Sequence, residues 1–154
     1  MADIDISQKD PYFIAVKIFL EKGDTFLILK DKFGDWDLPG GRIKKFEFEA
    51  PLEEIIKRKM SEELSTDFEY SVEKKPEVLM RHERIEASPG NPTVHIFGLG
   101  YRAQLVSGEP KISEAHTEQV WVNIDTFKPE DYFKGGWLSG VQEYLALRKS
   151  YDIL

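Results

Sequence analysis

The sequence contains no cysteine among its 154 residues, which excludes disulfide bonds, thiolate zinc sites, iron–sulfur clusters and thiol nucleophiles. Long apolar runs are also missing, because the stretch from Phe13 to Leu20 is short and contains Lys17. We therefore expect no membrane-spanning helix and no membrane partner. The first residues, MADIDISQKDPYF, lack the basic start and apolar core of a signal peptide. Together these absences predict a soluble, cytoplasmic protein.

Positive charge is scarce relative to negative charge: 21 Lys and Arg residues face 28 Asp and Glu residues, a formal net charge of -7. Non-specific binding to nucleic acid relies on Lys and Arg that neutralise phosphates, so we expect no nucleic-acid partner. A small phosphorylated ligand remains compatible if a metal ion or local cations offset the charge. The chain is 41% hydrophobic and 12% aromatic, enough for one core. We predict a single domain over residues 1–154.

The order of predicted elements indicates the fold class. Runs rich in β-branched and aromatic residues predict strands at 12–20, 25–30, 68–73, 77–85, 93–105 and 118–124. Apolar residues at helical spacing predict helices at 51–64 and 137–150. The charged, Gly- and Pro-containing segment 31–49 is longer than most loops, which is typical of a functional loop. Strands interleaved with a central and a terminal helix indicate an α/β domain, either α+β or a layered α/β/α arrangement.

The predicted helix 51–64 carries charges on its apolar face. Successive residues turn by about 100°, which places Glu63 and Lys59 inside that face and Glu62 at its edge. A buried carboxylate needs a cation, a metal ion or several hydrogen-bond donors. Two interpretations follow. Lys59 and Glu63 form a partly buried ion pair, or Glu62 and Glu63 face a hard divalent ion such as Mg²⁺.

The segment before this helix contains the groups that an anionic ligand would need. Gly40 and Gly41 let the backbone approach an ion or a phosphate closely, and Arg42, Lys44 and Lys45 place cations beside them. No G-x-S-x-G motif, P-loop or Rossmann fingerprint is present. Acyl transfer, P-loop nucleotide hydrolysis and dehydrogenase chemistry therefore have no support.

The motif Leu38-Pro39-Gly40-Gly41-Arg42, followed by the segment RKMSEEL at 58–64, resembles the Nudix box, G-x5-E-x7-R-E-U-x-E-E-x-G-U. The similarity covers roughly residues 12 to 126, including an acidic segment at 114–118. This resemblance implies a Nudix-type α/β/α sandwich with a mixed sheet. It also implies a hydrolase that uses Mg²⁺ or Mn²⁺ to cleave a nucleoside diphosphate linked to another group. Nudix proteins often dimerise, so a homodimer is a further expectation.

The sequence departs from the box in three places. The loop is about three residues longer, so Glu47 has the expected spacing from Gly41 but not from Arg58. Lys59 stands where the box has its first Glu, and Ser65 replaces the final glycine. A lysine one turn before Glu63 can replace the charge of one metal ion, so we expect fewer ions than in a full Nudix site. The same departures leave open a Nudix-fold module that binds a nucleotide without hydrolysing it.

The GDP-mannose mannosyl hydrolases are a similar branch, because they also lack that Glu and have a sequence like GGRIKK. They cleave at the sugar carbon, so the resemblance implies a nucleotide sugar as substrate. It implies that Gly40 and Glu63 hold Mg²⁺ and that Arg42 and Arg58 assist the leaving diphosphate or orient Glu63. The alanine at 115 departs from a metal-binding amide of that branch. His116 is the implied general base, since a neutral imidazole near pH 7 can activate water.

The remaining candidates each have two interpretations. Glu62 and Glu118 are predicted metal ligands, but Glu118, like Glu114, is equally compatible with a solvated loop acid. Lys44 and Trp36 are predicted to bind substrate, although an aromatic residue near a turn is more often part of the core. The same choice between base stacking and core applies to Phe33 and Tyr101, and His82 and His95 are expected to be structural or surface residues.

Overall fold

The computed structural model describes residues 6–151, so part of the segment used to exclude a signal peptide lies outside the described residues. The elements follow the order η1 (Ile6–Gln8), β1 (Tyr12–Lys22), β2 (Thr25–Asp31), β3 (Trp36–Asp37), β4 (Gly40–Arg42), η2 (Lys45–Glu47), α1 (Leu52–Leu64), β5 (Phe68–Val72), β6 (Val78–Ile85), β7 (Thr93–Gly108), β8 (His116–Asn123), η3 (Pro129–Asp131) and α2 (Gly135–Tyr151). No helix in this range is long and apolar enough to cross a membrane.

The strands form one mixed sheet of eight strands, in which β1 is central. Strand β1 pairs in parallel with β7, and its other edge pairs antiparallel with β4 and, at the hairpin, with β2. Lys17 lies opposite Gly40 in the β1–β4 pairing. The long β7 pairs with β6 along its first part and with β5 along its second part. This pairing brings the glycine segment beside the centre of the sheet.

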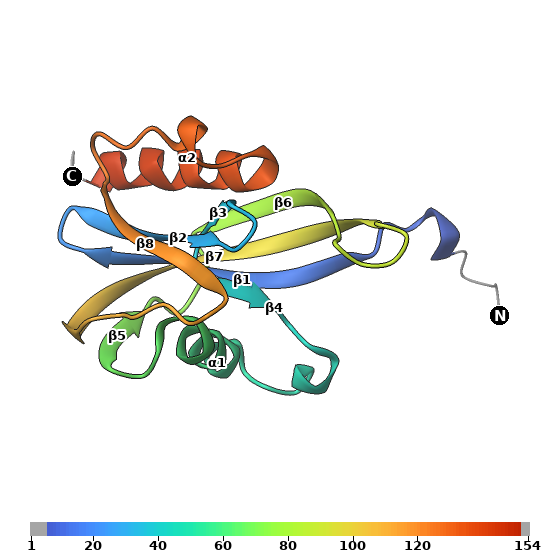
Figure 1. Cartoon of the computed structure of the whole chain (residues 1–154), viewed down its shortest axis with the longest axis horizontal. Coiled ribbons are helices and arrows are strands. Elements are labelled where there is room, and N and C mark those ends of the chain that lie inside the picture. Colours follow the sequence, from blue (N-terminus) through green and yellow to red (C-terminus); the bar gives the residue numbers. More distant parts are fainter. Residues whose placement is uncertain (1–5, 152–154) are drawn as a thin grey trace.

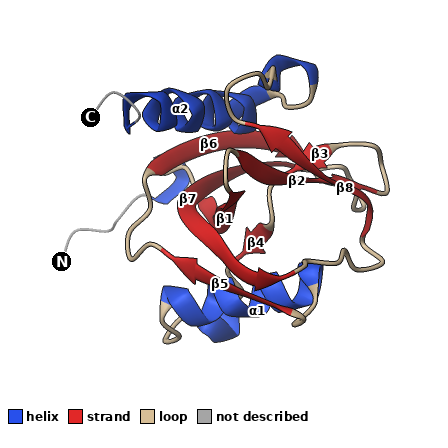
Figure 2. Ribbon diagram, turned by 90° about the vertical axis from the view of Figure 1, so that its left-hand side faces the viewer, coloured by secondary structure: helices blue, strands red, loops and turns tan. Residues whose placement is uncertain are grey.

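One helix covers each face of the sheet (Figures 1 and 2). Successive side chains of a strand point to opposite faces, so β1 contributes to two cores. Val16, Ile18 and Leu20 pack on the side of α1, whereas Phe19 packs with Tyr144 of α2 on the other side. The predicted α/β/α sandwich with a mixed sheet is therefore confirmed.

The structure corrects several sequence predictions. The segment 31–49 is not one loop, because it contains β3, β4 and η2, which tie it to the sheet. Helix α2 begins at Gly135, two residues earlier than predicted, and β7 extends to Gly108. Leu52 belongs to the apolar stripe of α1 by spacing but is 39% exposed at the first turn of the helix. The other predicted strands and helices differ from the observed ones only at their ends.

Candidate active site between the glycine segment and helix α1

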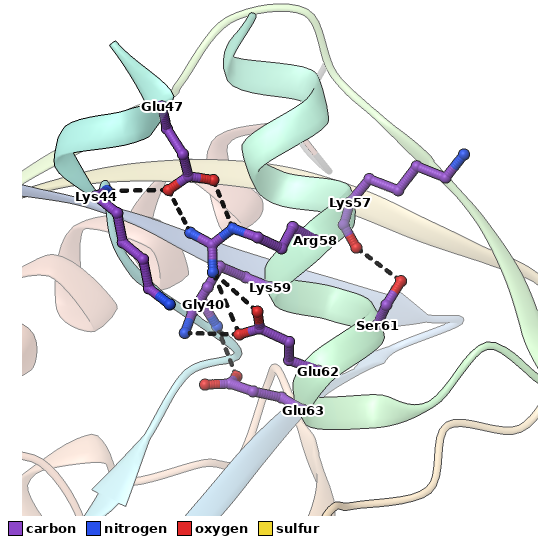
Figure 3. A network of polar contacts seen from close by, with 9 residues as sticks. All are labelled: Gly40, Lys44, Glu47, Lys57, Arg58, Lys59, Ser61, Glu62 and Glu63. Carbon is purple, nitrogen blue, oxygen red and sulfur yellow. Dashed lines mark hydrogen bonds and ion pairs between the residues drawn. The ribbon is translucent and has the colours of Figure 1, made fainter. Parts of the chain in front are cut away.

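Gly40 brings β4 against both β1 and the end of α1. Its φ is +140°, and an added Cβ would collide with the backbone oxygen of Val16. Only glycine allows this close approach. The Gly40 N–H donates a hydrogen bond of 2.9 Å to Glu63 Oε2 (Figure 3). The resemblance implied that Gly40 and Glu63 share one ion, and the structure places these two residues in direct contact.

The carboxyl group of Glu63 is desolvated, and few hydrogen-bond donors or positive charges offset the cost of ionising it. Burial raises its pKa from the ordinary 4.5 to about 7. The hydrogen bond from Gly40 and the charges of Lys17 and Lys59 lower this pKa, whereas the charge of Asp37 raises it. Among residues 6–151, Gly40 provides the only hydrogen bond to this carboxyl. Glu63 therefore exchanges its proton near neutral pH, and a further cationic partner would stabilise its ionised form.

An ion pair on β1 and β3 lies close to Glu63. Lys17 is only 5% exposed, and its Nζ lies 2.8 and 2.9 Å from the two carboxylate oxygens of Asp37. The same ammonium lies 4.8 Å from the ring centroid of Trp137. Sequence reasoning did not find this pair. A lysine inside the apolar strand 12–20 was its only signal, because a strand interior rarely buries a charge without a partner.

Arg58 joins the extra loop to helix α1. Its guanidinium donates to both carboxylate oxygens of Glu47 and also to Glu62, at 3.1 Å from Oε1 (Figure 3). Glu47 is 6% exposed, and the hydrogen bond from Arg58, opposed by burial, holds its pKa below the usual value. The described contacts of Arg58 are with Glu47 and Glu62, so its predicted role in orienting Glu63 has no direct contact behind it. The spacing of Glu47 from Gly41 was the signal that could have identified this pair.

The ion pair between Lys59 and Glu63, one of the two interpretations of the helix face, is not formed. The Lys59 ammonium instead lies 3.4 Å from Glu62 Oε2. Its side chain packs against Gly41, where an added Cβ would overlap the end of the lysine. Glu62 is exposed, with its side chain 45% accessible, and is shared between Arg58 and Lys59. The two acids of the helix are therefore in different surroundings.

His116 begins β8, opposite Asp31 of β2. Burial lowers the pKa of its imidazole, and the charges of Asp37 and Asp31 oppose that effect. Its Nδ1 is shielded from solvent and has no hydrogen-bond partner among the described residues. The charges of Asp37, Lys17 and Lys59 act on both His116 and Glu63. The structure thus brings His116 into the same electrostatic environment as the carboxyl.

The other predicted residues have described contacts with partners other than Glu63. Arg42 pairs with Glu86 and lies 5.0 Å from the ring of Phe13, so it faces the β6–β7 hairpin. Glu118 pairs with Lys30 at 3.6 Å on the β2–β8 edge. Trp36 packs edge-on against Tyr132 at 5.3 Å, next to the core of the α2 side. The Lys44 ammonium lies 5.8 Å from the Phe46 ring, and its backbone N–H donates to Glu47.

The structure also shows the surroundings of the remaining histidine and aromatic candidates. His82 accepts a hydrogen bond from the Gly136 N–H and stacks on Trp137, and His95 lies between Asp10 and Glu83. These contacts agree with the predicted structural roles. Tyr101 is core at 3% exposure, whereas Phe33 is exposed at 77%.

The acidic side chains at the end of α1 are the candidate ligands for a divalent ion. Within residues 6–151, no group of three or more His, Asp and Glu side chains is arranged to hold a metal ion. Mg²⁺, however, commonly takes one or two carboxylates and completes its shell with water and substrate phosphate oxygens. The under-compensated Glu63 and the neighbouring, exposed Glu62 fit that requirement.

Solved structures of other proteins share the fold of this chain. A MutT NUDIX hydrolase from Burkholderia pseudomallei is 22% identical, with a TM-score of 0.62 over 86% of this chain and 98% of that one. A MutT protein from Methanosarcina mazei is 19% identical, with a TM-score of 0.64 over 92% and 97% of the two chains. An ADP-ribose pyrophosphatase from Streptococcus suis is 14% identical, with a TM-score of 0.60 over 91% and 92%.

No curated protein matches the chain in sequence. The family model for the NUDIX domain, in contrast, matches residues 9–138, which include the glycine segment, α1, His116 and the start of α2. The chain belongs to the NUDIX family of hydrolases.

Proposed function

We propose that this chain is a Mg²⁺-dependent hydrolase of a nucleoside diphosphate linked to a sugar. The observation that carries the proposal is the desolvated carboxyl of Glu63, which is bonded to Gly40 and has a pKa raised to about 7 by burial. Strongly shifted pKa values are common at functional sites, where the carboxyl binds a cation or transfers a proton during turnover.

In this proposal, different residues of the chain bind the metal ion, position its ligands and accept the proton. A divalent ion bound here supplies Lewis-acid neutralisation of the diphosphate. Glu63 and the Gly40 carbonyl, with Glu62 next to them, are the ligands we propose for it. Arg58 fixes Glu62 through a charge-assisted hydrogen bond. His116, which burial keeps neutral near pH 7, accepts a proton from the attacking water. The ionised form of Glu63 is the second candidate for that base.

The sugar-linked substrate class rests on two supports. The sequence GGRIKK and the absence of the first box Glu resemble the GDP-mannose mannosyl hydrolases. The structural neighbour from Streptococcus suis is named for ADP-ribose, which is also a nucleoside diphosphate joined to a sugar. We therefore place GDP-mannose and ADP-ribose first in a substrate panel, followed by other nucleotide sugars and by dinucleoside polyphosphates.

The test compares the wild type with Glu63→Gln on this panel in Mg²⁺. We expect the loss of a ligand and proton acceptor to reduce kcat/KM by about 10³-fold or more. Glu54→Gln is the matched control, since Glu54 is exposed on the same helix. Unchanged turnover by Glu63→Gln would remove the proposed role of this carboxyl.

The bond cleaved is a separate question with its own measurement. Hydrolysis in ¹⁸O-labelled water introduces the label into the product that water attacks. Label in the sugar indicates C–O cleavage, as the resemblance to the GDP-mannose branch implies. Label in the phosphate indicates P–O cleavage and would place the reaction with the pyrophosphatases.

A second candidate function is nucleotide binding without turnover. It is favoured by Glu62, whose carboxylate is already occupied by Arg58 and Lys59. Calorimetry with nucleoside diphosphates in Mg²⁺, run beside the activity panel, separates the two candidates. Tight binding with no hydrolysis at any metal concentration supports the binding module, and measurable hydrolysis excludes it.

A further inference from the structure

Near the start of β7, a histidine bridges two carboxylates that come from different segments of the chain. The Nδ1 atom of His95 lies 2.7 Å from Asp10 Oδ2, and its Nε2 atom lies 2.9 Å from Glu83 Oε2. Glu83 is the residue opposite His95 in the β6–β7 pairing, whereas Asp10 lies two residues before β1 begins. The imidazole therefore connects the segment before β1 to strand β6.

This bridge lies away from Glu63 and beside a cavity. The ring of Tyr12, the first residue of β1, is 5.5 Å from the ring of His95. Lys17, which pairs with Gly40, is five residues further along the strand, a distance of about 16 Å. A cavity of about 510 Å³ is lined by the three bridged residues and by Tyr12, among others. Asp10, His95 and Glu83 thus form part of the wall of this cavity.

Only the protonated imidazole can bind both carboxylates at once. An ionised carboxylate accepts hydrogen bonds and donates none, so each ring nitrogen must carry a proton. The hydrogen bonds to Glu83 and Asp10 raise the pKa of His95 above its ordinary value of 6.5. The neutral ring has one N–H group, so its other nitrogen would present a lone pair to a carboxylate. Deprotonation of His95 therefore costs one of the two contacts.

The surroundings of the ring indicate which contact is lost. The pairing of β6 with β7 keeps Glu83 beside His95 whatever the charge of the ring. Asp10 lies in a segment without strand pairing, so it can move away. The cations on the same two segments, Lys9 and Arg81, make no contact with the ring within residues 6–151. The two carboxylates are therefore the charged groups that control the protonation of His95.

We propose that His95 is a proton-operated clasp for the segment before β1. The imidazolium holds Asp10 against β6, whereas the neutral imidazole keeps its proton on Nε2 for Glu83 and releases Asp10. Because the pKa of His95 is raised in the folded protein, the clasp is complete below pH 6.5 and opens as the pH rises through the raised value. Release moves one wall of the cavity. This inference is independent of the proposed function, since neither metal nor nucleotide takes part.

NMR of the whole chain, without metal or nucleotide, tests the clasp between pH 5 and pH 9. We expect His95 to have the highest pKa of the three histidines, because burial lowers the pKa of His82 and of His116. The backbone amide signal of Asp10 should shift with the same midpoint as the ring of His95. A neutral ring protonated on Nδ1 overturns the inference, and so does an Asp10 amide that does not follow the ring.

Two variants separate the contact from the overall charge. Asp10→Asn removes one ionised partner, so the pKa of His95 should fall. Glu143→Gln is the matched control, because it makes the same charge change at an exposed residue of α2 and should leave the pKa of His95 unchanged. An equal fall in both variants overturns the inference, since the effect would then reflect net charge alone.

A third variant keeps the inference testable if Asp10→Asn folds poorly. Glutamine does not titrate in this range, so His95→Gln should abolish the shift of the Asp10 amide signal between pH 5 and pH 9. A shift that persists in His95→Gln with the wild-type midpoint overturns the clasp, because another group would then control this segment.

Discussion

Two carboxyl groups are withdrawn from water, one on strand β1 and one on helix α1, and their surroundings are opposite. Glu21 on β1 is 1% exposed, and its oxygens accept hydrogen bonds from Arg102, Gln104, Tyr144 and Arg148. Burial raises its pKa, but the hydrogen bonds and charges around it prevail and hold the pKa below 4.5. Glu63 has one described hydrogen bond and a pKa of about 7.

This difference indicates that Glu21 and Glu63 have different roles in the protein. The ionised Glu21 is compensated by donors of the fold itself, so it ties β1 to β7 and α2. The ionised Glu63 is only partly compensated, by the Gly40 hydrogen bond and the charges of Lys17 and Lys59, so the fold loses stability when it deprotonates. A buried carboxylate with few donors around it is suited to bind an external cation. A buried carboxylate whose oxygens all accept hydrogen bonds instead stabilises the fold.

The largest expected effect is at Glu21. Glu21→Gln leaves the guanidinium groups of Arg102 and Arg148 without a buried counter-charge, so we expect a loss of about 3 kcal/mol in the free energy of unfolding at pH 7. Urea denaturation measures this loss. Glu77→Gln removes a more exposed partner of Arg102, at 3.8 Å, and should cost less than about 1 kcal/mol. Equal losses in the two variants would contradict the structural role of Glu21.

Glu63→Gln should change the free energy of unfolding in the opposite direction, by stabilising the fold. A carboxyl whose pKa is higher in the folded state stabilises the fold when protonated. That contribution is complete below pH 4.5 and is lost as the pH rises through about 7. The difference between these values corresponds to about 3 kcal/mol. Because glutamine does not ionise, Glu63→Gln should be more stable than the wild type at pH 8, by up to about 3 kcal/mol.

Urea denaturation of both proteins at pH 4.5 and pH 8 measures this effect. The gain in stability should shrink toward zero at the lower pH, where Glu63 is protonated in the wild type. Glu62→Gln is the control, since Glu62 is exposed and its pKa is lowered rather than raised. A Glu63→Gln variant that is less stable than the wild type at pH 8 would show that the carboxylate is compensated after all.

The smallest effect is expected at Lys59. Its charge lowers the pKa of Glu63, but burial and the Gly40 hydrogen bond have larger effects. Lys59→Gln should therefore raise the pKa of Glu63 by less than about one pH unit. Titration of the side-chain carboxyl carbon by NMR measures this change. A fall in the pKa of Glu63 would show that the lysine does not act on this carboxyl as a nearby positive charge.

The sequence predicted the features that depend on local spacing. Helical periodicity located α1 and showed that Glu63 lies on its apolar face, and the motif placed Gly40 next to it. Of the two interpretations of the charged helix face, the pair between Lys59 and Glu63 is not observed, because Lys59 contacts Glu62 instead. Helix geometry allows both pairs, and the contact of Lys59 with Gly41 is a tertiary feature.

Pairs far apart in the sequence could not be predicted. Lys17 meets Asp37 only because β4 fixes the register between β1 and the glycine segment. Arg42 was predicted to act on substrate, but its partner Glu86 comes from the β6–β7 hairpin, whose position follows from strand pairing. The spacing of residues along the sequence does not show which distant residues will meet in either contact.

The most direct test of the central claim is to measure, on one preparation of Glu63→Gln at pH 8, its stability in metal-free buffer and its hydrolysis in Mg²⁺. The under-compensated carboxyl predicts a variant that is more stable than the wild type and that has lost turnover on nucleotide sugars by about 10³-fold or more. A variant that is less stable but fully active would contradict the account, because Glu63 would then be a structural acid like Glu21.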